Sequence, residues 1–146
     1  MPKNEGSSVL VGITMKILVY GVGGIGGFIG SFLCKTKFAT TFLSRGKTFL
    51  NLKKNGLKLE SLLGNQESRN IQITDNLDDF NEFDIIILSV KLYDLKTCLL
   101  NIKKGILMKS LRVAFFGCLS GPDLIQSWEL FSENKSDITL IERCLI

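Results

Sequence analysis

The sequence predicts an α/β fold in which an open, mainly parallel sheet carries helices on both faces. Short apolar runs rich in strand-forming residues alternate with segments whose apolar residues recur at helical spacing. A glycine-rich turn joins the first of these strands to the first of these helices. The chain has 146 residues, 45% apolar and 22% charged, which suits one globular domain with a buried core and excludes a disordered or fibrous chain.

The first strand is predicted over residues 16–20, an apolar run that ends in glycine as a buried parallel strand does. A helix is predicted after the turn, because apolar residues follow one another there at i, i+3, i+4, i+7 and i+8. These are Ile25, Phe28, Ile29, Phe32 and Leu33.

A membrane-spanning helix is the alternative for this region, because residues 17–34 form an uncharged run of 18 residues. Six of those residues are glycine, which disfavours one continuous helix. The division into strand, turn and helix is the better interpretation, so we expect no membrane partner.

The next elements are a strand over residues 39–43 and a helix over residues 47–54 that stops at Asn55-Gly56. Residues 57–61 and 69–74 alternate in polarity around a turn, which predicts a small antiparallel excursion. One helical turn is expected over residues 76–81, capped by Asp75 or Asn76.

Residues 84–90 form the most strand-like segment and are apolar on both faces, which predicts a place at the centre of the sheet. A helix is expected over residues 92–102, then a strand over 112–116 and a helix over 123–131. We therefore divide the chain into a disordered leader (residues 1–14), an α/β domain (15–116) and a divergent or truncated C-terminal segment (117–146).

The turn after the first strand contains the pattern G-x-G-x-x-G at Gly21, Gly23 and Gly26. Between a strand and an amphipathic helix, this pattern is typical of a dinucleotide-binding site and of a Rossmann-type sheet. The first glycine permits the tight turn, the second lets a pyrophosphate approach the backbone, and the third lets helix and strand pack closely. The predicted pyrophosphate site consists of Gly21, Val22, Gly23, Gly24, Ile25 and Gly26.

The end of the second strand distinguishes NADP from NAD. NAD sites usually have an acidic residue there, which accepts a hydrogen bond from the ribose 2′-hydroxyl. This chain has Ser44-Arg45-Gly46-Lys47 instead. Because an arginine pairs with a 2′-phosphate and a carboxylate repels it, we predict NADP as the cofactor, held by Arg45 with help from Ser44 and Lys47.

Val90 and Lys91 follow the strongest strand at its carboxyl end, the edge at which ligands bind in open parallel sheets. Lys91 is predicted to reach the nicotinamide ribose or a substrate carboxylate. The plain alternative is an ordinary first-turn lysine.

Charge and cysteine usage exclude several other functions. The net charge of +4 is too small to indicate a nucleic-acid partner, although residues 16–59 contain no carboxylate, which suits an anionic ligand. The chain has no histidine, and its four cysteines lack metal-binding or redox spacing, so we expect no metal site. Reduced cysteines indicate a cytoplasmic protein.

With these motifs, the chain from about Met15 to Lys104 resembles the N-terminal domain of ketopantoate reductases (2-dehydropantoate 2-reductases). The resemblance rests on the glycine turn, on Ser44-Arg45-Gly46, on Asn55-Gly56-Leu57 and on residues 83–94 with their Val-Lys pair. It implies NADPH-dependent reduction of ketopantoate, a small 2-keto acid, to pantoate on the route to pantothenate and coenzyme A. It also implies the pyrophosphate at residues 21–26, the 2′-phosphate at Arg45 and the nicotinamide end at Lys91.

The chain departs from the family after this domain. The family has Asn-Gly after the next strand, where this chain has Phe116-Gly117. In the family, the catalytic lysine and the substrate-binding acidic residue lie in a second, helical domain, which we do not expect within these 146 residues. We therefore expect no catalytic residue here and little activity from this chain alone. The alternatives are a non-catalytic NADP-binding module, a split-enzyme subunit that needs a partner chain, a different NADP-dependent reductase and a degenerate gene remnant.

Overall fold

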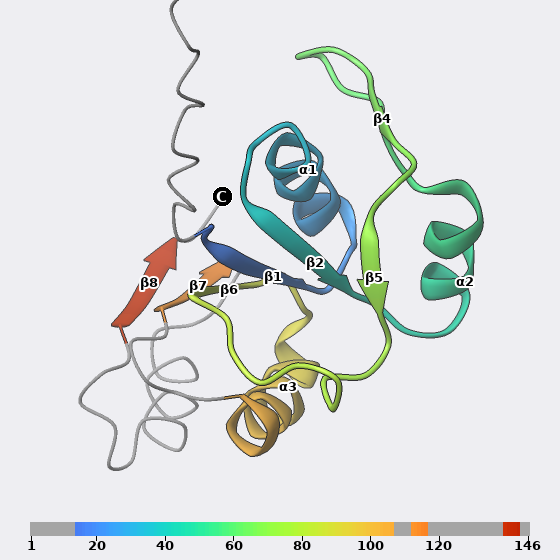
Figure 1. The fold of residues 1–146 in the computed structure, drawn as a ribbon. Coiled ribbons are helices and arrows are strands. Elements are labelled where there is room, and N and C mark those ends of the chain that lie inside the picture. The colour runs from blue at the N-terminus through green and yellow to red at the C-terminus, as the bar shows by residue number, and fades with distance from the viewer. Residues whose placement is uncertain (1–13, 107–111, 117–138, 144–146) are drawn as a thin grey trace, which may run out of the picture.

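The computed structural model describes residues 14–106, 112–116 and 139–143, and in them the main sheet is parallel throughout (Figure 1). Its strand order is β5-β2-β1-β6-β7-β8. The bounds are β1 Lys16–Tyr20, β2 Ala39–Leu43, β5 Gln72–Thr74, β6 Ile85–Leu88, β7 Arg112–Phe116 and β8 Thr139–Arg143. This is the doubly wound order of Rossmann-type sheets, so the predicted fold class is confirmed.

Helices cover both faces of the sheet. They are α1 (Gly24–Leu33), α2 (Gly46–Asn55) and α3 (Leu92–Gly105), with α1 and α3 on opposite sides (Figure 1). Each face has its own apolar core. Leu18 and Ile86 pack against α3 on one face, whereas Val19 and Phe42 pack beneath α1 and α2 on the other.

The strand β1 lies at the point where the chain changes direction across the sheet. It pairs with β2 on one side and with β6 on the other, so that Leu18 is opposite both Thr41 and Ile86. Successive strands are added outward from β1 through β2, and the chain then returns to add β6 on the other side. Crevices outside the carboxyl ends of such strands are the usual ligand sites.

The helix α1 packs through small residues rather than through its large apolar ones. Gly26, Gly30 and Ser31 are buried, whereas the side chains of Ile25 and Phe32 are 37% and 38% exposed. A side chain at Gly30 would overlap the ring of Phe42. The helix therefore approaches the sheet closely on its glycines, and the expected apolar stripe lies along its flank.

The antiparallel excursion forms with different boundaries. The hairpin pairs β3 (Leu57–Leu59) with β4 (Gln66–Ser68), not with residues 69–74. β5 instead joins the main sheet in parallel with β2, where Ile73 packs into the Phe42 cluster. The prediction for residues 69–74 is therefore wrong, because burial of Ile73 outweighs local pairing.

The helical turn expected over residues 76–81 is also wrong. These residues form a hydrogen-bonded turn, in which Phe80 N donates to Leu77 O at 3.0 Å. The Asn76 side chain accepts from Asp78 N at 3.1 Å, so it caps a turn rather than a helix.

The remaining predicted elements agree with the structure where it describes them. Strands over 16–20, 39–43 and 112–116 have the expected bounds, and α3 runs three residues beyond Ile102. β6 lies inside the sheet as expected, but it covers residues 85–88 and not the whole predicted range of 84–90. The strand β8 was not expected. The predicted helix over 123–131 and nearly all of the predicted leader lie outside the described residues. Among the described helices, none has both the length and the apolar character needed to cross a membrane.

Candidate functional site

A cavity of about 430 Å³ opens at the carboxyl ends of β1 and β6, where the strand order reverses. The loops after β1, β2 and β6 line it, together with residues from the first turn of α2 and the first two turns of α3. It therefore lies where sheet topology predicts a ligand site.

The structure brings seven of the predicted site residues to this cavity, from three separate loops. They are Gly21, Val22, Gly23, Ser44, Arg45, Val90 and Lys91.

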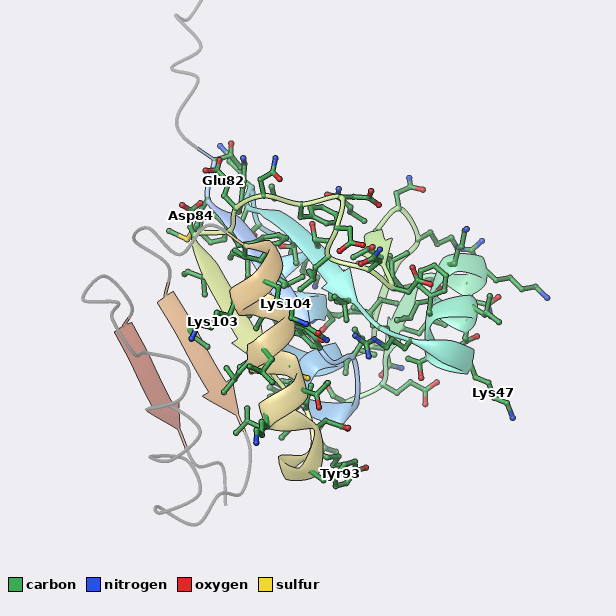
Figure 2. All side chains as sticks on the ribbon, turned by 90° about the horizontal axis from the view of Figure 1, so that it is seen from below. Lys47, Glu82, Asp84, Tyr93, Lys103 and Lys104 are labelled. Carbon is green, nitrogen blue, oxygen red and sulfur yellow. The ribbon has the colours of Figure 1, made fainter. Side chains whose placement is uncertain are left out.

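Four other predicted residues do not line the cavity. Gly24 borders a neighbouring hollow of about 600 Å³. Ile25 is partly exposed on the flank of α1, and Gly26 is buried in the packing of the turn. Lys47 is exposed, and its side chain extends from α2 away from the body of the molecule (Figure 2).

Two glycines of the turn are required by its geometry. Gly21 has φ of +94°, and a Cβ there would lie 2.6 Å from the carbonyl oxygen of Ser89. A Cβ at Gly26 would collide with the carbonyl oxygen of Gly21. Gly23 differs, because a Cβ at that position would have no atom within 4 Å. The open space beside Gly23 is where a bound group can approach the backbone.

The start of α1 faces this space without a side-chain cap. Gly23 is the N-cap residue and supplies no side-chain hydrogen bond, and the first turn contains no acidic residue. The N–H groups and the positive end of the helix dipole are therefore available to an anion.

Main-chain hydrogen bonds fix the loops that line the cavity. Gly21 N donates to Leu43 O at 3.1 Å and Ser89 N donates to Tyr20 O at 2.9 Å. The carboxyl ends of β2, β1 and β6 are thereby joined along the rim of the cavity.

The charged residues around the cavity are mainly cationic. Arg45 and Lys91 contribute positive charge, and Asp94 contributes one carboxylate. Arg45 is the N-cap of α2, and its Nη2 atom donates to the Tyr20 hydroxyl at 3.4 Å. This balance suits an anionic ligand.

Sequence reasoning missed several residues that line the cavity, among them Tyr20, Asp94, Thr97 and Cys98. The last three recur at i, i+3 and i+4 on α3, a polar stripe that the sequence displays next to the predicted Lys91. Burial raises the pKa of both the Tyr20 phenol and the Cys98 thiol. Both groups are therefore neutral at physiological pH.

The geometry defines a class of protein, namely a Rossmann-type α/β domain with a glycine-rich turn at the switch point of its sheet. The family model described as ketopantoate reductase PanE/ApbA matches residues 17–115. The chain belongs to this family.

Solved structures agree with the fold. The 2-dehydropantoate 2-reductase from Porphyromonas gingivalis W83 has a TM-score of 0.70 and 22% identity, over 90% of this chain and 46% of that one. A D-mandelate dehydrogenase, solved with NADH and anilino(oxo)acetate, has a TM-score of 0.68 and 20% identity, over 88% of this chain and 40% of that one. The chain thus spans less than half the length of either protein.

A different match covers a shorter stretch. Over 46 residues, the chain is 98% identical to the glutamate–tRNA ligase of Prochlorococcus marinus (strain MIT 9515). These residues are 32% of this chain and 10% of that ligase. The match is too small a part of the ligase to define the class of this chain.

Proposed function

We propose that this chain binds NADP(H) as the cofactor domain of a 2-dehydropantoate 2-reductase-like oxidoreductase. The observation that carries the proposal is the meeting of Arg45 with the uncapped start of α1 around one cavity. Family membership supports an oxidoreductase of this kind.

The backbone of residues 21–26 is proposed to hold the cofactor pyrophosphate. The space beside Gly23 admits it, and the N–H groups at the start of α1 neutralise part of its charge. The buried Gly26 contributes by close packing and not by contact.

Arg45 is proposed to bind the 2′-phosphate of the adenosine ribose. A guanidinium offers two parallel donors to a phosphate, and Ser44 adds a hydroxyl beside it. The flexible side chain of Lys47 contributes positive charge from the same turn.

Val90 and Lys91 are proposed to contact the nicotinamide half of the cofactor. When bound, NADPH supplies the hydride that reduces a 2-keto acid. The residues of this chain bind and orient the cofactor, and the groups that polarise the keto oxygen are proposed to come from a helical domain in the same enzyme or in a partner chain. Because the chain belongs to the ketopantoate reductase family, we also propose a cytoplasmic role in pantothenate synthesis.

This chain alone is proposed to bind nucleotide without appreciable turnover. It spans 46% of the P. gingivalis reductase. Ketopantoate-dependent loss of NADPH absorbance from the purified chain at a rate typical of reductases would contradict this.

A thermal-shift comparison of NADPH, NADH and no ligand tests the cofactor assignment. Binding to the native state raises the melting temperature, and NADPH should raise it more than NADH at equal concentration. No shift with either nucleotide would overturn the proposal.

NADH is the second candidate cofactor, because the structurally similar D-mandelate dehydrogenase was solved with it. A larger shift with NADH than with NADPH would favour this alternative. A non-catalytic NADP-binding module would show the NADPH shift but gain no activity from any added helical domain.

A further inference from the structure

Tyr20 is a buried tyrosine to which the cofactor assignment gives no role. Tyr20 is 4% exposed, and its hydroxyl accepts hydrogen bonds from Arg45 Nη2 at 3.4 Å and from Asn101 Nδ2 at 3.5 Å. Arg45 itself is exposed. The exposed guanidinium of Arg45 is thus hydrogen-bonded to the side chain of a buried residue of β1.

The Arg45 side chain lies between two cavities. The large cavity is the proposed cofactor site, and a smaller one of about 190 Å³ lies beside it. Tyr20, Leu43 and Arg45 line both, so they form the wall between them.

The smaller cavity contains a competing partner for Arg45. Asp78 lines it, and Asn76 Nδ2 holds the Asp78 carboxylate through a hydrogen bond of 2.9 Å. A guanidinium that turned toward Asp78 would form an ion pair and leave the cofactor cavity. The Tyr20 hydroxyl opposes this turn, because it accepts from the guanidinium at the wall.

We propose that Tyr20 is a positioning residue for cofactor specificity, whose hydroxyl holds Arg45 toward the cofactor cavity and away from Asp78. The role of Tyr20 rests on the proposed NADP(H) function. It explains how a single exposed arginine can distinguish a cofactor with a 2′-phosphate from one with a 2′-hydroxyl.

The test measures the affinity of the full chain for 2′,5′-ADP relative to 5′-AMP. These two probes differ only in the 2′-phosphate. Tyr20→Phe should reduce this preference about three- to tenfold, the range for loss of one hydrogen bond. Combined with Arg45→Ala, it should cause no further loss, because Tyr20 acts through the arginine. Tyr93→Phe is the matched control, since this second tyrosine is 80% exposed and projects from the start of α3 (Figure 2).

Rescue by Asp78→Asn distinguishes positioning from a loss of packing. Removing the competing carboxylate from the Tyr20→Phe variant should restore most of the preference for the 2′-phosphate. A merely structural role for Tyr20 would leave the double variant as impaired as the single one, and that result would overturn the inference.

A measurement on the unaltered chain covers the case in which Tyr20→Phe does not fold. The chain has two tyrosines, so a ¹³C label at the phenol carbon gives two signals, and Tyr93→Phe assigns them. The Tyr20 signal should move with 2′,5′-ADP and much less with 5′-AMP. Equal movement with both would overturn the inference.

Failure of the inference and failure of the proposed function remain distinguishable. If the wild-type chain prefers 2′,5′-ADP and Tyr20→Phe keeps that preference, only the role of Tyr20 is wrong. If the wild-type chain shows no preference, the proposed NADP(H) function is wrong as well.

Discussion

The backbone N–H of Ser89 donates a hydrogen bond to the carbonyl oxygen of Tyr20 at 2.9 Å, which joins the loop after β6 to the end of β1. The next residue, Gly21, donates in turn to Leu43 at the end of β2. The rim of the cavity is therefore held by main-chain atoms. The shape of the rim is therefore most sensitive to substitution at its glycines, where an added side chain would overlap the backbone.

Substitutions at Gly26 and Gly23 should affect different properties, namely stability at Gly26 and cofactor binding at Gly23. Gly26→Ala forces a methyl group against the Gly21 carbonyl and should lower the free energy of unfolding by about 1–3 kcal/mol. Gly23→Ala meets no atom within 4 Å, so it should leave stability nearly unchanged but weaken NADPH binding. Chemical denaturation and a binding titration of both variants test this. Equal loss of stability in the two would contradict it.

Arg45→Ala should narrow the difference in affinity between NADPH and NADH. Loss of a charged hydrogen bond to the 2′-phosphate should cost NADPH about tenfold in affinity while NADH stays nearly unchanged. Arg69→Ala is the control, because Arg69 is an exposed arginine that pairs with Glu67 in the small hairpin region. If the gap between the two cofactors is unmoved, the role of Arg45 is wrong.

Lys91→Ala should weaken both cofactors alike. The nicotinamide halves of NADPH and NADH are identical, so a contact there changes both affinities by a similar factor, about three- to tenfold. Lys96→Ala provides a comparison, because Lys96 is an exposed lysine of α3, the helix that Lys91 precedes, and does not line the cavity. A change in the NADPH-to-NADH ratio would instead indicate that Lys91 lies near the 2′-phosphate.

Stability should fall in alkaline solution. Burial raises the pKa of Cys98 above its ordinary value of 9.0 and that of Tyr20 above 10.0. The folded state therefore keeps these protons at a pH where the unfolded state has lost them, and the associated stability is present below about pH 9 and decreases as the pH rises further. Melting temperatures measured between about pH 8 and pH 10 test this and should fall toward the alkaline end.

The Cys98→Ala variant should lose less stability than the wild-type chain over the same alkaline range. This variant lacks the titrating thiol, even though its stability at neutral pH is lower. An equal or steeper alkaline loss in the variant would show that Cys98 does not contribute.

The centre of the sheet could be predicted from sequence because its strands are short, apolar and bounded by glycine or polar residues. The runs at 16–20 and 39–43 need no knowledge of their neighbours. The edge could not be predicted in this way. Residues 72–74 have a pattern that fits a hairpin equally well, and only the packing of Ile73 beside Phe42 decides the outcome.

The positions of Gly21, Gly23 and Arg45 at the cavity could be predicted, because each lies in a loop whose own sequence carries the signal. Tyr20 and Cys98 were missed because an apolar pattern gives no reason to separate them from the core. Tyr20 and Cys98 are 78 positions apart in the sequence (98 − 20), and they interact only because β1 and α3 meet in the folded chain.

The most direct test is a crystal structure of the chain with NADP⁺. The account predicts the pyrophosphate against the backbone at Gly23 and the start of α1, with the 2′-phosphate bound by the Arg45 guanidinium. An empty glycine turn, or a 2′-phosphate far from Arg45, would contradict it.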